Sequence, residues 1–214
     1  MLESETIITV RRQLHGIAEG FIAGPQYRAA GTIRLAVRPD GFTGTALPVA
    51  VHGTRLEWPG GAVELAGPVG ELVRVSGLDF GPPPEDLYRP ASPLALDSVL
   101  DIDADASEVI HRSLYAGATA LKAVLPEGHP VLWSEHFDVG VSDDEVNYGV
   151  SAGDDFHPLP YAYVGPWDFG TATRPDPFWN APFGAVHPLE VSADPDALAA
   201  GIADFFRLGR QRLW

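Results

Sequence analysis

A histidine and an aspartate two residues apart stand in the segment SEHFDVG, at positions 136 and 138. Alternate side chains of an extended strand share a face, so His136 and Asp138 are predicted to lie side by side. A histidine beside a carboxylate forms a general base with its orienting acid, or two ligands of a divalent metal. Both residues are therefore our catalytic candidates. The alternative is that they only decorate the solvated face of a half-buried sheet.

A second group follows in the segment SAGDDFHPLP, where Asp154, Asp155 and His157 lie on a loop that contains glycine and proline; Asp154 and His157 are the two we select. Carboxylate oxygens and an imidazole nitrogen are ligands for hard or borderline cations, so these two residues are our metal candidates. An exposed turn in an acidic chain is the competing interpretation. The sequence leaves the metal, and any other cofactor, unidentified.

Two runs with a period of two residues, 131–142 and 146–151, must position the first group. We predict an antiparallel pair joined by a loop at Asp143 and Asp144, which places Phe137 opposite Val150. One face of this pair is apolar and belongs in the core. The other face carries the polar set Ser134, His136, Asp138, Asn147 and Ser151.

Space for a ligand is predicted above that polar face, because Gly140 and Gly149 carry no side chains there. A third strand, 161–164, and a long loop, 165–187, come next in the chain. Loops of this length without periodicity are uncommon and often functional. The predicted pocket residues are Ser134, Asn147, Ser151, Tyr161, Tyr163, Trp167 and Trp179. The same aromatic residues equally suit the core or a subunit contact, which leaves a homo-oligomer open.

The rest of the chain predicts an α+β fold that is mostly antiparallel sheet with three main helices. Helical spacing predicts a first helix over residues 4–21, which Gly20, Gly24 and Pro25 should end. A second helix is predicted over 105–124, with a capping box at Asp105. A last helix is predicted to begin at Asp194. Short strands separated by turn residues lie between them. His15 is expected at the surface or its boundary.

One domain, 1–214, is the predicted organisation. It has two similar halves of helix plus meander, 1–80 and 94–214, joined by a proline-rich linker at 81–93.

Composition restricts the partners and the compartment. The net charge of −15 argues against nucleic acid and against anionic membranes. With no Cys there is no disulfide, thiol nucleophile or Cys-ligated metal. The first residues lack the pattern of a signal peptide and no apolar run is long enough to span a bilayer, so a cytoplasmic protein is expected.

The run LWSEHFDVGV, followed by VNYGVSAGDDFHPLPYAYVGPW, resembles a family of uncharacterised bacterial proteins of actinobacterial type. The resemblance covers about residues 105–170. No activity is established for that family, so the resemblance implies neither a function nor catalytic residues.

Two function classes are compatible with the sequence, and whether the protein is an enzyme stays open. The first is a protein with a small-molecule pocket, either a binder or a metal-assisted hydrolase. The second is a non-enzymatic interaction module that uses the aromatic loop 165–187 as its contact surface.

Overall fold

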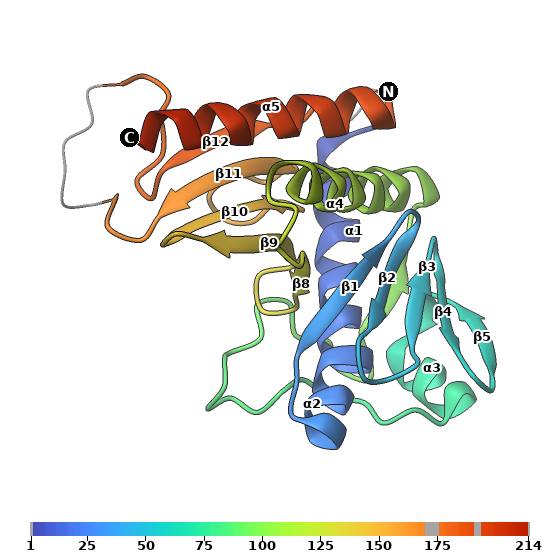
Figure 1. The fold of residues 1–214 in the computed structure, drawn as a ribbon. Coiled ribbons are helices and arrows are strands. Elements are labelled where there is room, and N and C mark those ends of the chain that lie inside the picture. Colours follow the sequence, from blue (N-terminus) through green and yellow to red (C-terminus); the bar gives the residue numbers. More distant parts are fainter. Residues whose placement is uncertain (1, 170–175, 191–193, 214) are drawn as a thin grey trace. The chain divides into compact units, whose positions relative to one another are not determined.

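A computed structural model describes residues 2–169, 176–190 and 194–213. The fold is α+β with antiparallel strand pairs and three main helices, as predicted (Figure 1). The chain forms two compact units: residues 1–111 with 132–137, and residues 112–131 with 138–214. Among the described residues, no helix combines the length and the apolar character that crossing a bilayer requires.

One long helical stretch leads the first unit. It consists of α1 (Ser4–Ile17), the π-helix η1 (Ala18–Ala23) and α2 (Gly24–Ala30), and it ends at Gly31 with a left-handed φ of +69°. The expectation that Gly20, Gly24 and Pro25 end the first helix is therefore wrong. Pro25 lies in the first turn of α2, directly after η1, and the helical stretch continues through it.

A meander of antiparallel strands packs with this stretch in the first unit, in the order β8-β1-β2-β3-β4-β5. The core contains Leu14, Phe21, Leu35, Phe42 and Leu56. A separate pair, β6 with β7, flanks the short helix α3 (Val69–Ser76). The strand bounds are Arg34–Arg38 (β1), Gly41–Gly44 (β2), Ala50–His52 (β3), Arg55–Trp58 (β4), Gly61–Glu64 (β5), Ala66–Pro68 (β6), Val99–Asp101 (β7) and Val131–Trp133 (β8).

Residues 78–98, which we name the strap, connect α3 to β7 without helix or strand and include the predicted linker. The strap lies against the long helical stretch. The Gly81 N–H donates to the Gly20 carbonyl at 2.9 Å. A Cβ at Gly24 would lie 1.9 Å from the Gly81 oxygen, so glycine is required for this approach. Gly20 and Gly24, which were expected to end the helix, instead allow the strap to approach it closely.

The described part of the second unit contains the antiparallel strand order β12-β11-β10-β9, packed against helices. Its strands are Asp138–Asp143 (β9), Val146–Ser151 (β10), Tyr161–Pro166 (β11) and Ala185–Pro188 (β12). Helix α5 (Pro195–Leu213) lies on this sheet, with Phe206 edge-on to Tyr148 at 5.9 Å (Figure 1).

Helix α4 (Ala104–Val124) begins in the first unit and continues in the second, where Gly117 meets Val139 and Val150. Its N-terminus is capped by Asp103, whose Oδ1 accepts the Ala106 N–H at 2.8 Å. The predicted capping box at Asp105 is therefore wrong.

The central hairpin has the predicted faces but a different register. Val139 pairs with Val150, and Val146 with Asp143, so the two-residue loop is Asp144-Glu145. Both loop residues have positive φ, as in a type I′ turn. The predicted loop lies one residue too early, which shifts every pair by two residues. An even shift preserves the faces, so the apolar side is correct and the pairing is wrong.

Candidate functional site

The segment Ser134–Phe137 is a turn and not part of the predicted strand 131–142. The Phe137 N–H donates to the Trp133 carbonyl at 2.8 Å, and Phe137 has a φ of +52°. Strand β9 begins only at Asp138. His136 and Asp138 therefore do not share a strand face, and the prediction that paired them by alternation is wrong.

The two aromatic side chains of this turn, His136 and Phe137, point in opposite directions. The His136 side chain is 71% exposed, and its Nε2 lies 3.3 Å from Glu135 Oε1. Phe137 is fully buried, stacks on His15 with ring centroids 5.2 Å apart, and meets Phe42 edge-on. These contacts hold a bulky residue in a backbone conformation that few such residues adopt.

His15 is buried, contrary to the expected surface position, and both ring nitrogens have partners. Nε2 lies 2.7 Å from the Ser134 carbonyl oxygen, which only accepts, so Nε2 carries the proton. Nδ1 is then an acceptor and faces Ser92 Oγ at 3.4 Å. Burial lowers the pKa of His15 to about 4, against the raising effect of the Ser134 bond, and Arg11 and His136 lower it further. The imidazole is neutral at pH 7.

Glu19 lies one helical turn after His15, within the π-helix. Its carboxyl accepts the backbone N–H groups of Ala91 and Ser92 at 3.3 Å each, and Oε1 lies 3.7 Å from His15 Nε2. Burial raises the pKa of Glu19 to about 7, although both N–H bonds favour the ionised form. The pair thus combines a neutral histidine with a carboxyl group that titrates near neutral pH. Environments that push two pKa values in opposite directions are typical of acid–base sites.

A third polar contact adjoins this pair. The Tyr88 hydroxyl lies 3.0 Å from Ser134 Oγ, and Ser134 is completely buried. Burial raises the pKa of Tyr88 well above its ordinary value, so the phenol stays protonated and able to donate. We name the five residues His15, Glu19, Tyr88, Ser92 and Ser134 the acid–base cluster.

The helix and the strap explain why these residues meet. Positions four apart lie on one helical face, which aligns His15 with Glu19. A π-helical turn adds a residue to that face and often occurs at functional sites. The strap then brings Tyr88 and Ser92 alongside.

The polar face of β9–β11 in the second unit gathers several other predicted residues. The Tyr163 hydroxyl donates to Asp138 Oδ2, and the Tyr161 hydroxyl donates to Asp154 Oδ2 at 2.6 Å. Burial raises the pKa of both tyrosines, and the neighbouring carboxylates raise it further. Ser151 is buried and accepts the Gly153 N–H at 3.0 Å. These phenols are fixed donors and not bases.

The two glycines of this face do not leave room for a ligand. A Cβ at Gly149 would lie 2.4 Å from the Tyr163 hydroxyl oxygen, and one at Gly140 would lie 3.2 Å from it. Gly140 and Gly149 therefore make space for the Tyr163 side chain on its way to Asp138. The predicted open space above the sheet is occupied by the protein itself.

Asp154 and His157, the two metal candidates, form hydrogen bonds within their own loop. Asp154 Oδ1 accepts the N–H groups of Phe156 and His157, at 2.8 and 3.0 Å, and His157 Nδ1 lies 2.8 Å from the Leu159 carbonyl oxygen. Within the ranges that the structure describes, no group of three or more histidine and acidic side chains is arranged to hold a metal ion. The assignment of Asp154 and His157 to a metal stays a prediction.

The remaining predicted residues are spread over the second unit. Asn147 Oδ1 accepts bonds from Ser142 Oγ at 2.7 Å and from Trp167 Nε1 at 3.0 Å, while Trp167 is 63% exposed. Trp179 is half-buried and packs edge-on against Phe178 at 5.0 Å. Part of the loop 165–187 falls in 170–175, outside the described residues. Its use as a contact surface stays a prediction.

Sequence reasoning found Ser134 and missed the other four members of the acid–base cluster. One signal was available: Arg11, His15 and Glu19 recur every fourth residue beside the apolar stripe of the first helix. Three ionisable residues at that spacing indicate a buried polar row when the opposite face is also covered. Nothing in the sequence indicated that the strap covers it.

Comparison of the chain with protein-family models, with curated proteins and with solved structures gives no match. The resemblance to the actinobacterial family therefore also stays a prediction.

Proposed function

We propose that the protein is a hydrolase that works by acyl transfer, with Ser92 as nucleophile and His15 as general base. One observation carries this proposal. The His15 ring is fixed by the Ser134 carbonyl at 2.7 Å, with its lone pair turned to the Ser92 hydroxyl at 3.4 Å. A nucleophile beside a base that a third group orients is the general arrangement of covalent catalysis.

The reaction begins when Ser92 Oγ attacks the acyl carbon of an ester and its proton moves to His15 Nδ1. The bond to the leaving alkoxide then breaks, and the His15 proton passes to that oxygen. Water attacks the acyl-Ser92 ester, gives a proton to His15, and the carboxylic acid is released as the proton returns to Ser92. Atoms and charges balance over the cycle, and no metal is needed.

Glu19 and the two hydroxyls have supporting parts in this proposal. The ionised Glu19 carboxylate, 3.7 Å from His15 Nε2, stabilises the imidazolium that forms during each proton transfer. The hydroxyls of Tyr88 and Ser134 are the candidate donors to the developing oxyanion. Because burial raises the pKa of Tyr88, the phenol is protonated and available as that donor at neutral pH.

The test is acylation by p-nitrophenyl acetate, followed by p-nitrophenol release and by mass spectrometry of the intact chain and its peptides. We expect a burst and one acetyl group on Ser92. Ser92→Ala should abolish the adduct, and His15→Gln should slow its formation by at least about a hundredfold. Ser98→Ala, at another serine of the strap, is the matched control and should react as the wild type does.

Acetylation that persists in Ser92→Ala, or that maps only to other residues, would refute the assignment of the nucleophile. Circular dichroism and urea unfolding of each variant establish that it is folded. A folded His15→Gln variant that acylates at the wild-type rate would refute the role of His15 as base.

A further inference from the structure

A separate cavity of about 320 Å³ lies in the first unit, between α2, the start of the strap and the loop before β3. Its volume falls at the lower end of the range of ligand pockets. The lining consists of Phe21, Pro25, Arg28, Ala29, Leu47, Leu78 and Asp79. None of these residues belongs to the acid–base cluster, so a ligand of this cavity is independent of the proposed hydrolase.

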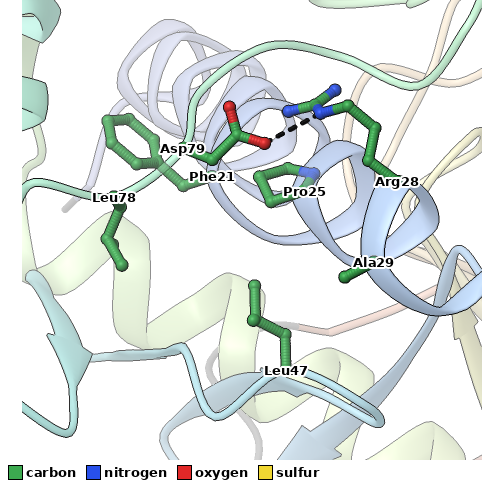
Figure 2. A pocket seen from close by; sticks show the side chains of 7 residues that line it. All are labelled: Phe21, Pro25, Arg28, Ala29, Leu47, Leu78 and Asp79. Carbon is green, nitrogen blue, oxygen red and sulfur yellow. Dashed lines mark hydrogen bonds and ion pairs between the residues drawn. The ribbon is translucent and has the colours of Figure 1, made fainter.

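The cavity is apolar with one ionic side. Figure 2 shows Arg28 and Asp79 joined at one side and Leu47 at the opposite side, with Phe21 beside Asp79 and Pro25 nearer the centre. The Phe21 ring is fully buried and is fixed by Phe80, with centroids 4.8 Å apart. A flat or branched apolar group fits such walls, and a polar group of the ligand must face the ion pair.

The guanidinium of Arg28 has little capacity left for a ligand. Its Nε donates to Asp79 Oδ2 at 2.8 Å, while Nη1 donates to the carbonyls of Gly81 and Pro82 at 3.3 and 3.1 Å. Nη2 also points to the Gly81 oxygen, at 3.4 Å. These carbonyls belong to the strap and hold the guanidinium in place.

Asp79 is the member of the pair that has acceptor capacity to spare. Its side chain is 61% exposed, and the bond to Arg28 uses only one of its two oxygens. A carboxylate accepts several hydrogen bonds, so Oδ1 can receive an ammonium group without breaking the Arg28 contact. The net charge of −15 also raises the local concentration of cations at the surface and lowers that of anions.

We propose that this cavity binds a small amine with an apolar aromatic or branched body. The body lies against Leu47 and Leu78, and the ammonium group donates to Asp79. An anionic ligand is disfavoured, because the bonds to Asp79 and to the strap use four of the five N–H groups of Arg28 and the Asp79 carboxylate lies beside the fifth.

The test uses three probes with the same ring and different heads: tryptamine, indoleacetate and methylindole. Each is titrated against the full chain by calorimetry, and NMR follows the backbone amides of Ala29 and Leu78. We expect tryptamine to bind most tightly and to shift both amides. Asp79→Asn should weaken tryptamine by about two- to fivefold, the range of a half-exposed ion pair, and leave methylindole unchanged.

Two further variants make the outcome decisive. Leu47→Trp fills the cavity and should abolish binding of all three probes, whereas Asp86→Asn, at an exposed acid of the strap outside the cavity, should change nothing. Equal binding of tryptamine and indoleacetate, or tighter binding of indoleacetate, would overturn the amine assignment. Absence of binding by every probe, or binding that Leu47→Trp leaves intact, would overturn the site. None of these outcomes bears on acylation of Ser92.

Discussion

At the scale of the residue, the main chemical feature is that the pKa of His15 lies below that of Glu19, the reverse of the ordinary order for a histidine and a glutamate. Burial lowers the pKa of His15 to about 4 and raises that of Glu19 to about 7. Each shift favours the neutral form, as expected for groups removed from water. An unpaired charge on His15 would be costly here, whereas one charge on Glu19, held by two backbone N–H groups, is accessible near neutral pH.

This reversed order of pKa values predicts the pH dependence of the proposed reaction. Acylation of Ser92 should accelerate as the pH rises through about 7, because ionised Glu19 stabilises the imidazolium that forms on His15. Glu19→Gln should lack that inflection and react at least about tenfold more slowly above pH 7. The measurement is the acylation rate with p-nitrophenyl acetate between pH 5 and 9 in wild type, Glu19→Gln and a Glu85→Gln control. If the inflection at pH 7 persists in Glu19→Gln, Glu19 is not the group responsible.

At the scale of the element, alternation in the sequence identified the faces of β9 and β10 but not their register or ends. The faces depend only on whether a residue is odd or even in its strand, and they survive a shift of two residues. The end of β8 depends on Phe137, which turns inward onto His15 and Phe42. Those partners are distant in sequence, so no local pattern predicts that turn.

The same limit explains the first helix and the site beneath the strap. Gly20 and Gly24 weaken a helix in isolation, and local reasoning ended the helix there. In the fold these glycines allow the strap backbone to approach, and contacts with residues 78–98 compensate for the weak local preference. The acid–base cluster joins that helix to the strap and to the turn 134–137. Local sequence patterns identify the helix, the strap and the turn separately, but they do not predict that the three segments are in contact.

The hairpin turn gives a prediction about stability. Asp144 and Glu145 have φ values of +47° and +61°, and a left-handed conformation costs an ordinary residue roughly 1–2 kcal/mol. Glu145→Gly creates the Asp-Gly pair that this turn type prefers and should stabilise the protein by about 1 kcal/mol in urea unfolding. Asp143→Gly, at an extended position of the same hairpin, should destabilise it. If Glu145→Gly also destabilised the protein, backbone strain at the turn would not be the controlling effect.

At the scale of the whole molecule, the α+β class and the antiparallel pairing were predictable from composition, turn residues and periodicity. The division into units was not, because segment 132–137 belongs with the N-terminal unit although its sequence neighbours do not. A single segment of chain thus contributes Ser134 and Phe137 to one unit and Asp138 to the other. The alternation across 131–142 conceals that boundary.

Buried histidines should also make the folded chain sensitive to acid. His111 of the first unit is buried beside Phe42, its Nε2 donates to the Gly53 carbonyl at 3.2 Å, and burial lowers its pKa to about 4. Between pH 6.5 and 4 the unfolded chain binds a proton at this histidine and the folded chain does not. Stability therefore falls as the pH drops through that window, by about 3 kcal/mol for His111.

Glu19 has the opposite sign, because its folded-state pKa is raised: it favours the folded state below pH 4.5, and that contribution is lost as the pH rises towards 7. The lowered pKa values of His15 and His111 both reduce stability on acidification, and only Glu19 increases it. The net change between pH 6.5 and 4.5 should therefore be a loss of stability on acidification. Urea unfolding across this range should show a shallower pH slope in His111→Leu than in the wild type. His129→Leu, at an exposed histidine, should leave the slope unchanged. An unchanged slope in His111→Leu would mean that His111 becomes protonated in the folded chain as readily as in the unfolded one.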